Sequence, residues 1–308
     1  MKLNNYQIVA IMTVFATLFL ILVGGLVRAS GSGLGCPDWP TCYGVWIPPT
    51  SVDTLPAGYD PLEFNAFKTW TEYVNRLIGV LIGLFITATF VLSFRYRKEK
   101  PSVTIASGIA FVLVIFQGWL GGQVVRSGLS EGIITLHMVI AMVLVGLLIF
   151  ATFKAFSGQI SIMLRSEHKK TLLMGTGILL LFTMLQMIFG TQVREAVDVI
   201  SRGTVFVERD NWLTNVGFID EFHRSFSWTV LLASVWMLWY IRKNSIIGYV
   251  QKLNFWIFLM IIGQVVIGIV LAYFGMPAIF QVLHLVGSAI LISMILLQFF
   301  SLRDAKVQ

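Results

Sequence analysis

The stretch that decides the fold is QGWLGGQVVRSGLSEGIITLH, residues 117–137, because its outline recurs as QVVIGIVLAYFGMPAIFQVLH, residues 264–284. Identities at a constant offset of 147 residues include Gln117 with Gln264, Gly121 with Gly268, Leu136 with Leu283, and His137 with His284. Each stretch joins the end of one apolar segment to the start of the next. Such internal similarity indicates a duplicated helical unit. In duplicated membrane proteins the binding site often lies between the repeated units.

Apolar residues dominate the chain. Hydrophobic residues make up 57% of its 308 residues and charged residues 12%, and the mean hydropathy is +0.83. Runs long enough to cross a hydrocarbon core of about 30 Å occur at 8–27, 72–94, 103–125, 132–153, 171–190, 220–241, 253–274 and 279–301. The sequence therefore predicts an all-α integral membrane protein with eight transmembrane helices.

The basic residues predict the orientation of these helices. Of the 22 Lys and Arg residues, fourteen fall in one set of connections, and the opposite set holds the other eight together with twelve of the 15 acids. Because Lys and Arg accumulate in cytoplasmic loops, both termini are expected to be cytoplasmic. The net charge of +7 follows from this topology, and no basic stripe suggests nucleic acid as a partner.

Further matches extend the repeat to the ends of the other helices. Gly24, Val27 and Arg28 match Gly190, Val193 and Arg194 at an offset of 166, and Glu72, Asn75 and Arg76 match Asp220, His223 and Arg224 at an offset of 148. The halves are expected to be two pseudo-symmetric four-helix bundles in the same orientation, residues 1–155 and 156–308. The outer connections differ, with about 44 residues in the first half and about 29 in the second. The first is interpreted as an ordered lid because it is rich in turn residues.

Two cysteines, Cys36 and Cys42, both lie in this first outer connection. An oxidising compartment would permit a disulfide between them. Two unpaired thiols are the alternative.

Three histidines share one depth. His137, His223 and His284 all fall within the first two turns of an even-numbered helix, near its outer end. Ionisable residues inside a membrane span usually mark function. Interhelical hydrogen bonds are the alternative, which explains a single histidine better than a depth-matched set. His168, in a cytoplasmic connection, is expected to be a solvated loop residue.

Haem is a better candidate ligand than zinc, because helical bundles hold cofactors between facing helices and no thiolate or carboxylate cluster completes a zinc site. In the second half, His223 and His284 would bind iron from opposite sides. In the first half, His137 faces Asn75, whose neutral amide is a weak iron ligand. That site is expected to bind haem from one side only, or to hold it mainly by packing and propionates. A coordination position would then be open for chemistry.

Charged side chains surround the expected haem sites. Five arginines lie at the outer helix ends: Arg28, Arg76, Arg126, Arg194 and Arg224. Their guanidinium groups suit haem propionates, and the alternative is contact with lipid phosphate. Glu72 lies three residues before Asn75 on the same helix face. It is expected to be a proton donor or charge stabiliser, or else a carboxylate that complements the helix N-terminus.

The segment GGLVRASGSGLGCPDWPTCYG, residues 24–44, followed by EYVNR, residues 72–76, resembles the haem A synthase family. EFHR at residues 221–224, the late Leu283-His284 and the duplicated halves extend the resemblance over essentially the whole chain. The resemblance implies an enzyme of a bacterial plasma membrane. Its reaction converts haem O to haem A for terminal oxidases, by successive hydroxylations of a ring methyl group to a formyl group.

The resemblance also implies roles for individual residues. His223 and His284 would ligate a haem b cofactor, with Arg224 and Arg194 beside it. Glu72 would be catalytic, and the substrate haem O site would comprise His137, Asn75, Arg76, Arg126 and Arg28. Cys36 and Cys42 match a cysteine pair of the family. Expected partners are haem O and membrane lipid, with a haem O synthase, an electron donor and a second copy of the chain as further candidates.

Two departures from the family pattern stand out. Asn75 replaces a histidine that many members carry, and a second cysteine pair found in some relatives is absent. The main alternative function is a two-haem membrane electron-transfer protein that modifies no haem. An electron path across the membrane would need haems near both faces, whereas the three histidines all lie near the outer face. A haem carrier or exporter is a third interpretation, which the pairing of His223 with His284 disfavours.

Overall fold

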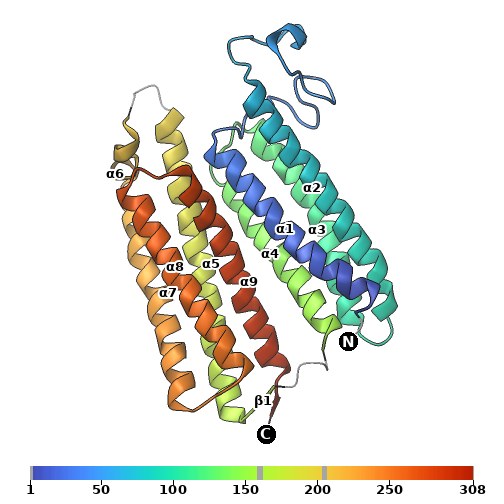
Figure 1. The fold of residues 1–308 in the computed structure, drawn as a ribbon, viewed down its shortest axis with the longest axis vertical. Coiled ribbons are helices and arrows are strands. Elements are labelled where there is room, and N and C mark those ends of the chain that lie inside the picture. The colour runs from blue at the N-terminus through green and yellow to red at the C-terminus, as the bar shows by residue number, and fades with distance from the viewer. Residues whose placement is uncertain (1–2, 158–161, 203–206, 308) are drawn as a thin grey trace.

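The computed structural model describes residues 3–157, 162–202 and 207–307, which are mostly helical (Figure 1). The long helices are α1 (Asn5–Ala29), α2 (Ala66–Ser93), α3 (Pro101–Arg126), α4 (Ile133–Ala155), α5 (Ser166–Arg202), α7 (Phe218–Lys243), α8 (Tyr249–Tyr273) and α9 (Ala278–Asp304). The short elements are η1 (Val52–Thr54), η2 (Phe94–Tyr96), η3 (Arg209–Asn211), α6 (Trp212–Val216), and the parallel strands β1 (Met163–Leu164) and β2 (Lys306–Val307). All eight predicted runs coincide with a long helix.

Seven helices in the described part of the chain are long and apolar enough to cross a membrane, namely all the long helices except α7. The 26 residues of α7 are sufficient in length. Its first turns contain Asp220, Glu221 and Arg224, however, and its remainder is rich in Trp and Ser, which lower its hydropathy. The prediction of an all-helical, multi-pass membrane protein is confirmed.

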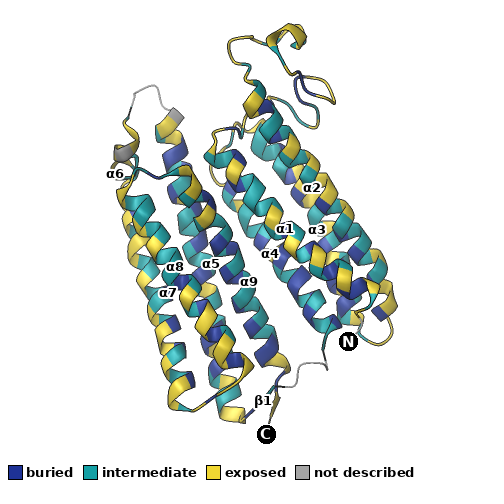
Figure 2. Cartoon of the chain, viewed as in Figure 1, coloured by how far each residue is buried: buried dark blue, intermediate teal, exposed yellow. Residues whose placement is uncertain are grey.

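Helices α1 to α4 pack successively, and α4 closes back on α1; α5, α7, α8 and α9 do the same. Contacts of α9 with α1 and α4 join the two groups (Figure 1). Met142 of α4, Met187 of α5 and Ile292 of α9 are buried together in an apolar cluster at this junction. Outer helix surfaces are widely exposed (Figure 2), and they include large apolar side chains such as Phe15 and Leu232. Lipid is the solvent that suits such surfaces.

Helix α5 corrects the expected second outer loop. The predicted span ended at residue 190, but α5 continues to Arg202. Val193 and Val197 are buried on one face of this extension, and Glu195 and Asp198 bond to the first half of the chain. These tertiary contacts stabilise additional helical turns beyond residue 190. The prediction assigned these turns to the loop because it considered only the length of the apolar run.

His168 also differs from its prediction. It lies in the first turn of α5 rather than in a solvated loop, and its Nδ1 is 3.0 Å from the hydroxyl oxygen of Tyr240 in α7. The prediction was wrong because the helix begins at Ser166, before the apolar run starts.

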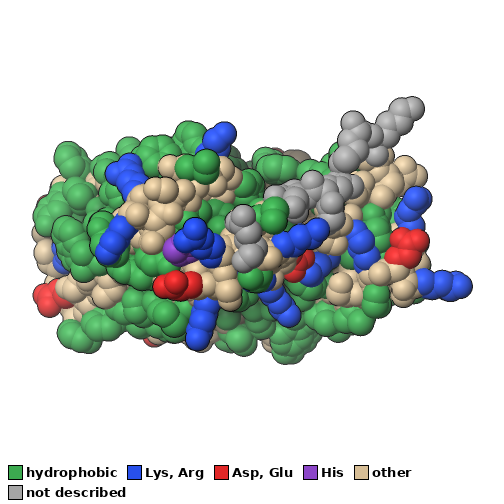
Figure 3. Space-filling model, turned by 90° about the horizontal axis from the view of Figure 1, so that it is seen from below, with side chains coloured by type: hydrophobic (Ala, Val, Ile, Leu, Met, Phe, Trp, Pro, Cys, Tyr) green, Lys and Arg blue, Asp and Glu red, His purple; other side chains and the backbone are tan. Residues whose placement is uncertain are grey.

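The two chain termini lie at the same end of the helices (Figure 1). Seen from this end, Lys and Arg side chains outnumber acidic ones (Figure 3). Strand β2 pairs here with β1, Lys154 Nζ lies 2.6 Å from Asp304 Oδ2, and Lys169 Nζ donates to Ala305 O at 2.6 Å. These contacts fasten the C-terminus to the connection between the two groups of helices.

Candidate functional site

His223 of α7 and His284 of α9 face each other. Their ring centroids are 6.4 Å apart and the ring planes are inclined by 83°. Two imidazoles on opposite sides of one iron would have a similar spacing, since each metal–nitrogen bond is about 2 Å and each ring centre lies roughly 1 Å beyond its nitrogen. Each Nδ1 atom is buried without a hydrogen-bond partner among the described residues. The pair therefore fits a haem iron between the two rings.

Amide and hydroxyl side chains fix the backbone at each histidine. Gln186 Nε2 donates to the carbonyl of His223 at 2.9 Å, and Gln117 Nε2 donates to the carbonyl of His137 at 3.0 Å. Ser288 Oγ donates to the carbonyl of His284 at 2.7 Å. Sequence comparison matched Gln117 with Gln264 but assigned neither a role. The structure shows that these polar residues hold the histidine-bearing turns in place.

A glycine lies beside each of the four candidate haem residues. A Cβ atom added at Gly190 would lie 3.0 Å from Cε1 of His223. In the other three pairs an added Cβ would make an ordinary van der Waals contact, with Gly121 and His137 at 3.6 Å, Gly268 and His284 at 3.9 Å, and Gly24 and Asn75 at 4.0 Å. Because Gly24 matches Gly190 and Gly121 matches Gly268 in the repeat, the duplication preserves this arrangement at all four positions.

Substitution of Gly190 by alanine is expected to reduce the haem retained by the purified protein by about tenfold, because the methyl group would displace His223 from the ring spacing. The matched control is Gly263→Ala in α8, where an added Cβ meets nothing within 4 Å. Haem content per protein from absorbance is the measurement. Equal haem content in the two variants would show that the space beside His223 is not needed.

The first half provides one imidazole and one amide. His137 of α4 and Asn75 of α2 are half-buried, as are their second-half equivalents His284 and His223. His137 Nδ1 and Asn75 Oδ1 are buried atoms without hydrogen-bond partners in the described chain. Both therefore have free capacity to meet a bound molecule.

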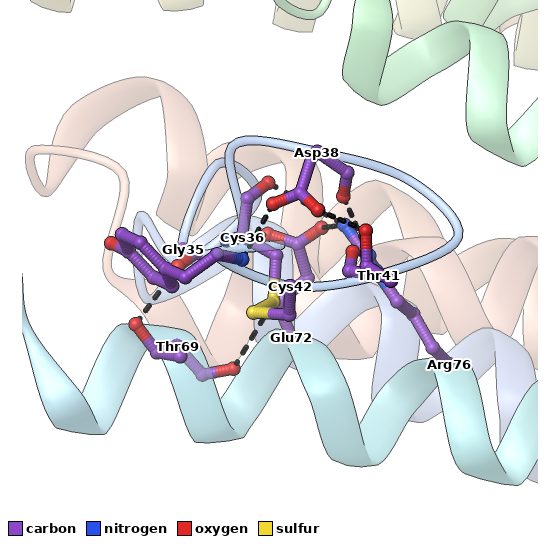
Figure 4. A network of polar contacts seen from close by, with 9 residues as sticks. Gly35, Cys36, Asp38, Thr41, Cys42, Thr69, Glu72 and Arg76 are labelled. Carbon is purple, nitrogen blue, oxygen red and sulfur yellow. Dashed lines mark hydrogen bonds and ion pairs between the residues drawn. A yellow bond between two sulfur atoms is a disulfide. The ribbon is translucent and has the colours of Figure 1, made fainter. Parts of the chain in front are cut away.

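Glu72 and Arg76 hold the first outer loop on α2 (Figure 4). Arg76 Nη1 donates to the carbonyls of Asp38 and Thr41, each at 2.8 Å, and Arg76 Nη2 lies 2.6 Å from Glu72 Oε1. Glu72 Oε2 accepts from the backbone N–H of Cys36 at 3.0 Å. Glu72 is only 4% exposed. Both of its carboxylate oxygens are thus engaged in a buried anchor.

The anchored loop is compact and ordered by its own contacts. Cys36 and Cys42 form a disulfide, which confirms the predicted pairing, and both are fully buried. Asp38 accepts hydrogen bonds from the Thr41 hydroxyl and from the backbone N–H groups of Tyr43 and Gly44. Buried aromatic packing of Tyr43 on neighbouring rings completes the loop.

Arg126 also contacts this loop. Its Nη2 donates to the carbonyl of Trp39 at 3.1 Å, and its guanidinium carbon lies 5.8 Å from the centre of the Trp39 ring. Gly122, one turn earlier in α3, permits the approach, because an added Cβ would lie 2.7 Å from the Trp39 ring. Loop, α2 and α3 therefore form one unit at this end of the first half.

Arg28 and Arg194, which are equivalent in the repeat, bind the same carboxylate. Arg28 donates to Asp198 Oδ2 from Nε at 3.1 Å and from Nη2 at 2.7 Å, and Arg194 Nη2 lies 2.8 Å from Asp198 Oδ1. One turn away, Glu195 accepts from the backbone N–H and hydroxyl of Thr135 at the start of α4. Asp198 and Glu195 thus bridge the two halves.

Sequence reasoning missed these two acidic residues. The available indication was helical spacing beyond the predicted span, where Val193 and Val197 share one face and Glu195 and Asp198 share the other.

Arg224 pairs with Asp220 Oδ2 at 2.5 Å, one turn earlier in α7. This ion pair is the repeat equivalent of Glu72 with Arg76. The Arg224 side chain is 45% exposed, against 14% for Arg76, because no disulfide loop covers it in the described part of the second half. Of the five predicted arginines, Arg76 and Arg224 directly follow the candidate haem residues Asn75 and His223, whereas Arg28, Arg126 and Arg194 lie on α1, α3 and α5. Among the described residues, no cluster of three His, Cys, Asp or Glu side chains forms a metal-ion site.

A family model described as cytochrome oxidase assembly protein matches residues 7–296 of the chain. The chain belongs to this family. Among similar members of the cytochrome oxidase assembly family, the heme A synthase of Exiguobacterium sp. is 28% identical over 236 residues, which are 75% of this chain and 72% of the relative. The heme A synthase of Shewanella oneidensis is 26% identical over 229 residues, 71% and 68% of the two chains. That of Bartonella tribocorum is 22% identical over 306 residues, 87% and 84%. The resemblance predicted from residues 24–44 and 72–76 is confirmed.

Proposed function

We propose that this protein is a haem A synthase, an oxidoreductase that oxidises a ring methyl of haem O to a formyl group. The observation that carries the proposal is the inequality of the two halves. The second offers two facing imidazoles, whereas the first offers one imidazole and an amide at the equivalent positions. A closed site suits electron transfer and an open site suits reaction. The relatives named heme A synthase favour this reaction.

In the second half, His223 and His284 would hold haem b, with Arg224 and Arg194 near its propionates. A bound haem b supplies one-electron redox chemistry. The chain holds the two imidazole rings 6.4 Å apart. Both would bind the haem, which would leave no place for another ligand. Arg194 already contacts Asp198, and a guanidinium group has five N–H donors, so one arginine can serve a carboxylate and a propionate together.

In the first half, His137 would bind and orient substrate haem O. Asn75, at the position equivalent to His223, would supply no second imidazole to this haem. Arg76 and Arg126 hold the disulfide loop over this end of the site, and Arg28 would share its donors between Asp198 and a propionate. The proton role of Glu72 stays a prediction. Since both Glu72 oxygens are bonded, proton transfer would require the ion pair with Arg76 to open.

The proposal includes eight crossings, two four-helix units over residues 1–155 and 156–308, and both termini in the cytoplasm of a bacterial cell. Helix α7 supports the eighth crossing, because it is 26 residues long and packs against both α5 and α8. An even number of crossings agrees with termini at one end of the molecule (Figure 1). The excess of basic side chains at that end supports a cytoplasmic location (Figure 3).

The test is pigment analysis of cells that make haem O and have no other haem A synthase. We expect extracted pigment to contain haem A when the chain is expressed, and only haem O with an empty vector. The enzymatic function would be contradicted if cells that express the chain contained haem O but no haem A, although the purified protein carried bound haem. That result would favour the alternative, an electron-transfer protein. A haem O synthase, an electron donor and a second copy of the chain remain predicted partners.

A further inference from the structure

Two grooves open on the outer surface of the helices, one in each half. The first, about 530 Å³, lies between α2 and α3, and its lining includes Phe90, Phe94 and Gly108. The second, about 590 Å³, lies between α7 and α8. Leu238, Arg242 and Phe255 are among its lining residues. Both grooves are formed at the end of the helices where the chain termini lie, since α2 and α7 end there and α3 and α8 begin there.

The repeat makes these grooves equivalent. Its offsets of 148 and 147 residues superpose Phe90 on Leu238, Phe94 on Arg242, and Gly108 on Phe255. The lining of the first groove contains no charged residue, whereas the second contains Arg242 and Lys243. Duplication therefore provides a comparison within one molecule: the same groove, with and without cations in its lining.

The two cations of the second groove have no acidic partner in the described structure. No Asp or Glu occurs in the sequence between Glu221 and Asp304, and Asp304 pairs with Lys154. Lys243 Nζ instead lies 4.6 Å from the centre of the Trp239 ring. Charge at this rim is thus left for a ligand to neutralise.

The rest of the second groove is apolar and aromatic. Val235, Trp239 and Phe255 line it and are 44%, 52% and 41% exposed. Trp side chains favour the boundary between hydrocarbon and water, and basic residues between transmembrane helices recruit anionic head groups. A soluble anion would use the cations but leave this apolar surface unmatched.

We infer that the α7–α8 groove is a binding site for an anionic diacyl phospholipid. Its acyl chains lie along Leu238, Phe255 and Phe258, and its phosphate is bound by Arg242 and Lys243. The equivalent α2–α3 groove takes acyl chains without selecting a charged head group. This site is separate from the candidate haem residues, and its test does not depend on the proposed enzymatic function.

The test is native mass spectrometry of the full-length protein in dodecyl maltoside, titrated with dioleoyl phosphatidylglycerol or dioleoyl phosphatidylcholine. Wild-type protein should retain phosphatidylglycerol at least about fivefold better than phosphatidylcholine. The double variant Arg242→Gln and Lys243→Gln should bind phosphatidylglycerol about tenfold more weakly. The matched control, Arg95→Gln with Arg97→Gln, removes the same charge at the corresponding end of the first half and should bind it as wild type does.

The variant Arg242→Phe is the control for misfolding, because phenylalanine already occupies the equivalent position, Phe94, in the first groove. This variant should lose the preference for phosphatidylglycerol. We also expect phosphatidylglycerol to raise the melting temperature of wild-type protein but not that of the variant. Equal binding of the two lipids by wild-type protein would overturn the inference. An equal loss of phosphatidylglycerol binding in the Arg95 and Arg97 control would also overturn it, because general surface charge would then explain the binding. Unchanged binding in all variants would overturn it as well, because the lipid would then bind elsewhere.

Discussion

Replacing His284 by alanine should remove the low-spin haem spectrum from the purified protein and lower haem A formation by more than about 100-fold, because supporting residues around a metal already contribute 10- to 100-fold. The variant leaves His223 facing an empty volume where a ring now lies 6.4 Å away. One remaining imidazole cannot keep an iron six-coordinate. His223→Ala should behave in the same way, since the two rings act as one pair.

The matched control for this prediction is His168→Ala. His168 contacts Tyr240 at the opposite end of the molecule, so its loss should leave the haem spectrum and haem A formation unchanged. Absorbance spectra of reduced protein and extracted pigments are the two measurements. A low-spin spectrum that survives in His284→Ala would assign the haem to other ligands and remove the basis for a closed second-half site.

Replacing Glu72 by alanine should destabilise the outer loop by about 3 kcal/mol, because it leaves the Arg76 guanidinium without its carboxylate partner. The Arg76 side chain is 14% exposed and that of Glu72 is 5% exposed, so solvent compensates little for the lost ion pair. The backbone N–H of Cys36 also loses its acceptor. Thermal unfolding and the rate of proteolysis within residues 37–65 would measure the effect.

Glu72→Gln separates anchoring from chemistry. Glutamine keeps the shape of the side chain and one acceptor oxygen, which can bond Arg76 or the backbone N–H of Cys36 but not both. It should therefore retain part of the loop stability that alanine loses, while it removes the carboxyl group that could exchange a proton. If Glu72 donates a proton, this variant should lose about 100-fold in haem A formation while its melting temperature falls less than that of Glu72→Ala. Undiminished conversion would leave Glu72 with an anchoring role alone. Glu63→Ala, an exposed acid of the same connection, is the control for general charge effects.

The sequence by itself determined the membrane class, the duplication and the family. Run length is a local property that hydrocarbon thickness selects, so the eight apolar runs predict eight long helices without knowledge of their packing. Matching offsets identified Gly121 with Gly268 and His137 with His284, and family motifs identified Asn75 as a departure. Helix periodicity placed the histidines at one depth because their distance from a helix end depends only on rise per residue.

Tertiary structure alone decided how the charged residues are used. Arg28 meets Asp198 across 170 positions of sequence, and Cys36 meets Glu72 across 36. The same long-range contacts extend α5 beyond residue 190. No local pattern specifies such pairs, because a buried charge is stable only where folding brings its partner, and that place depends on the packing of all the helices.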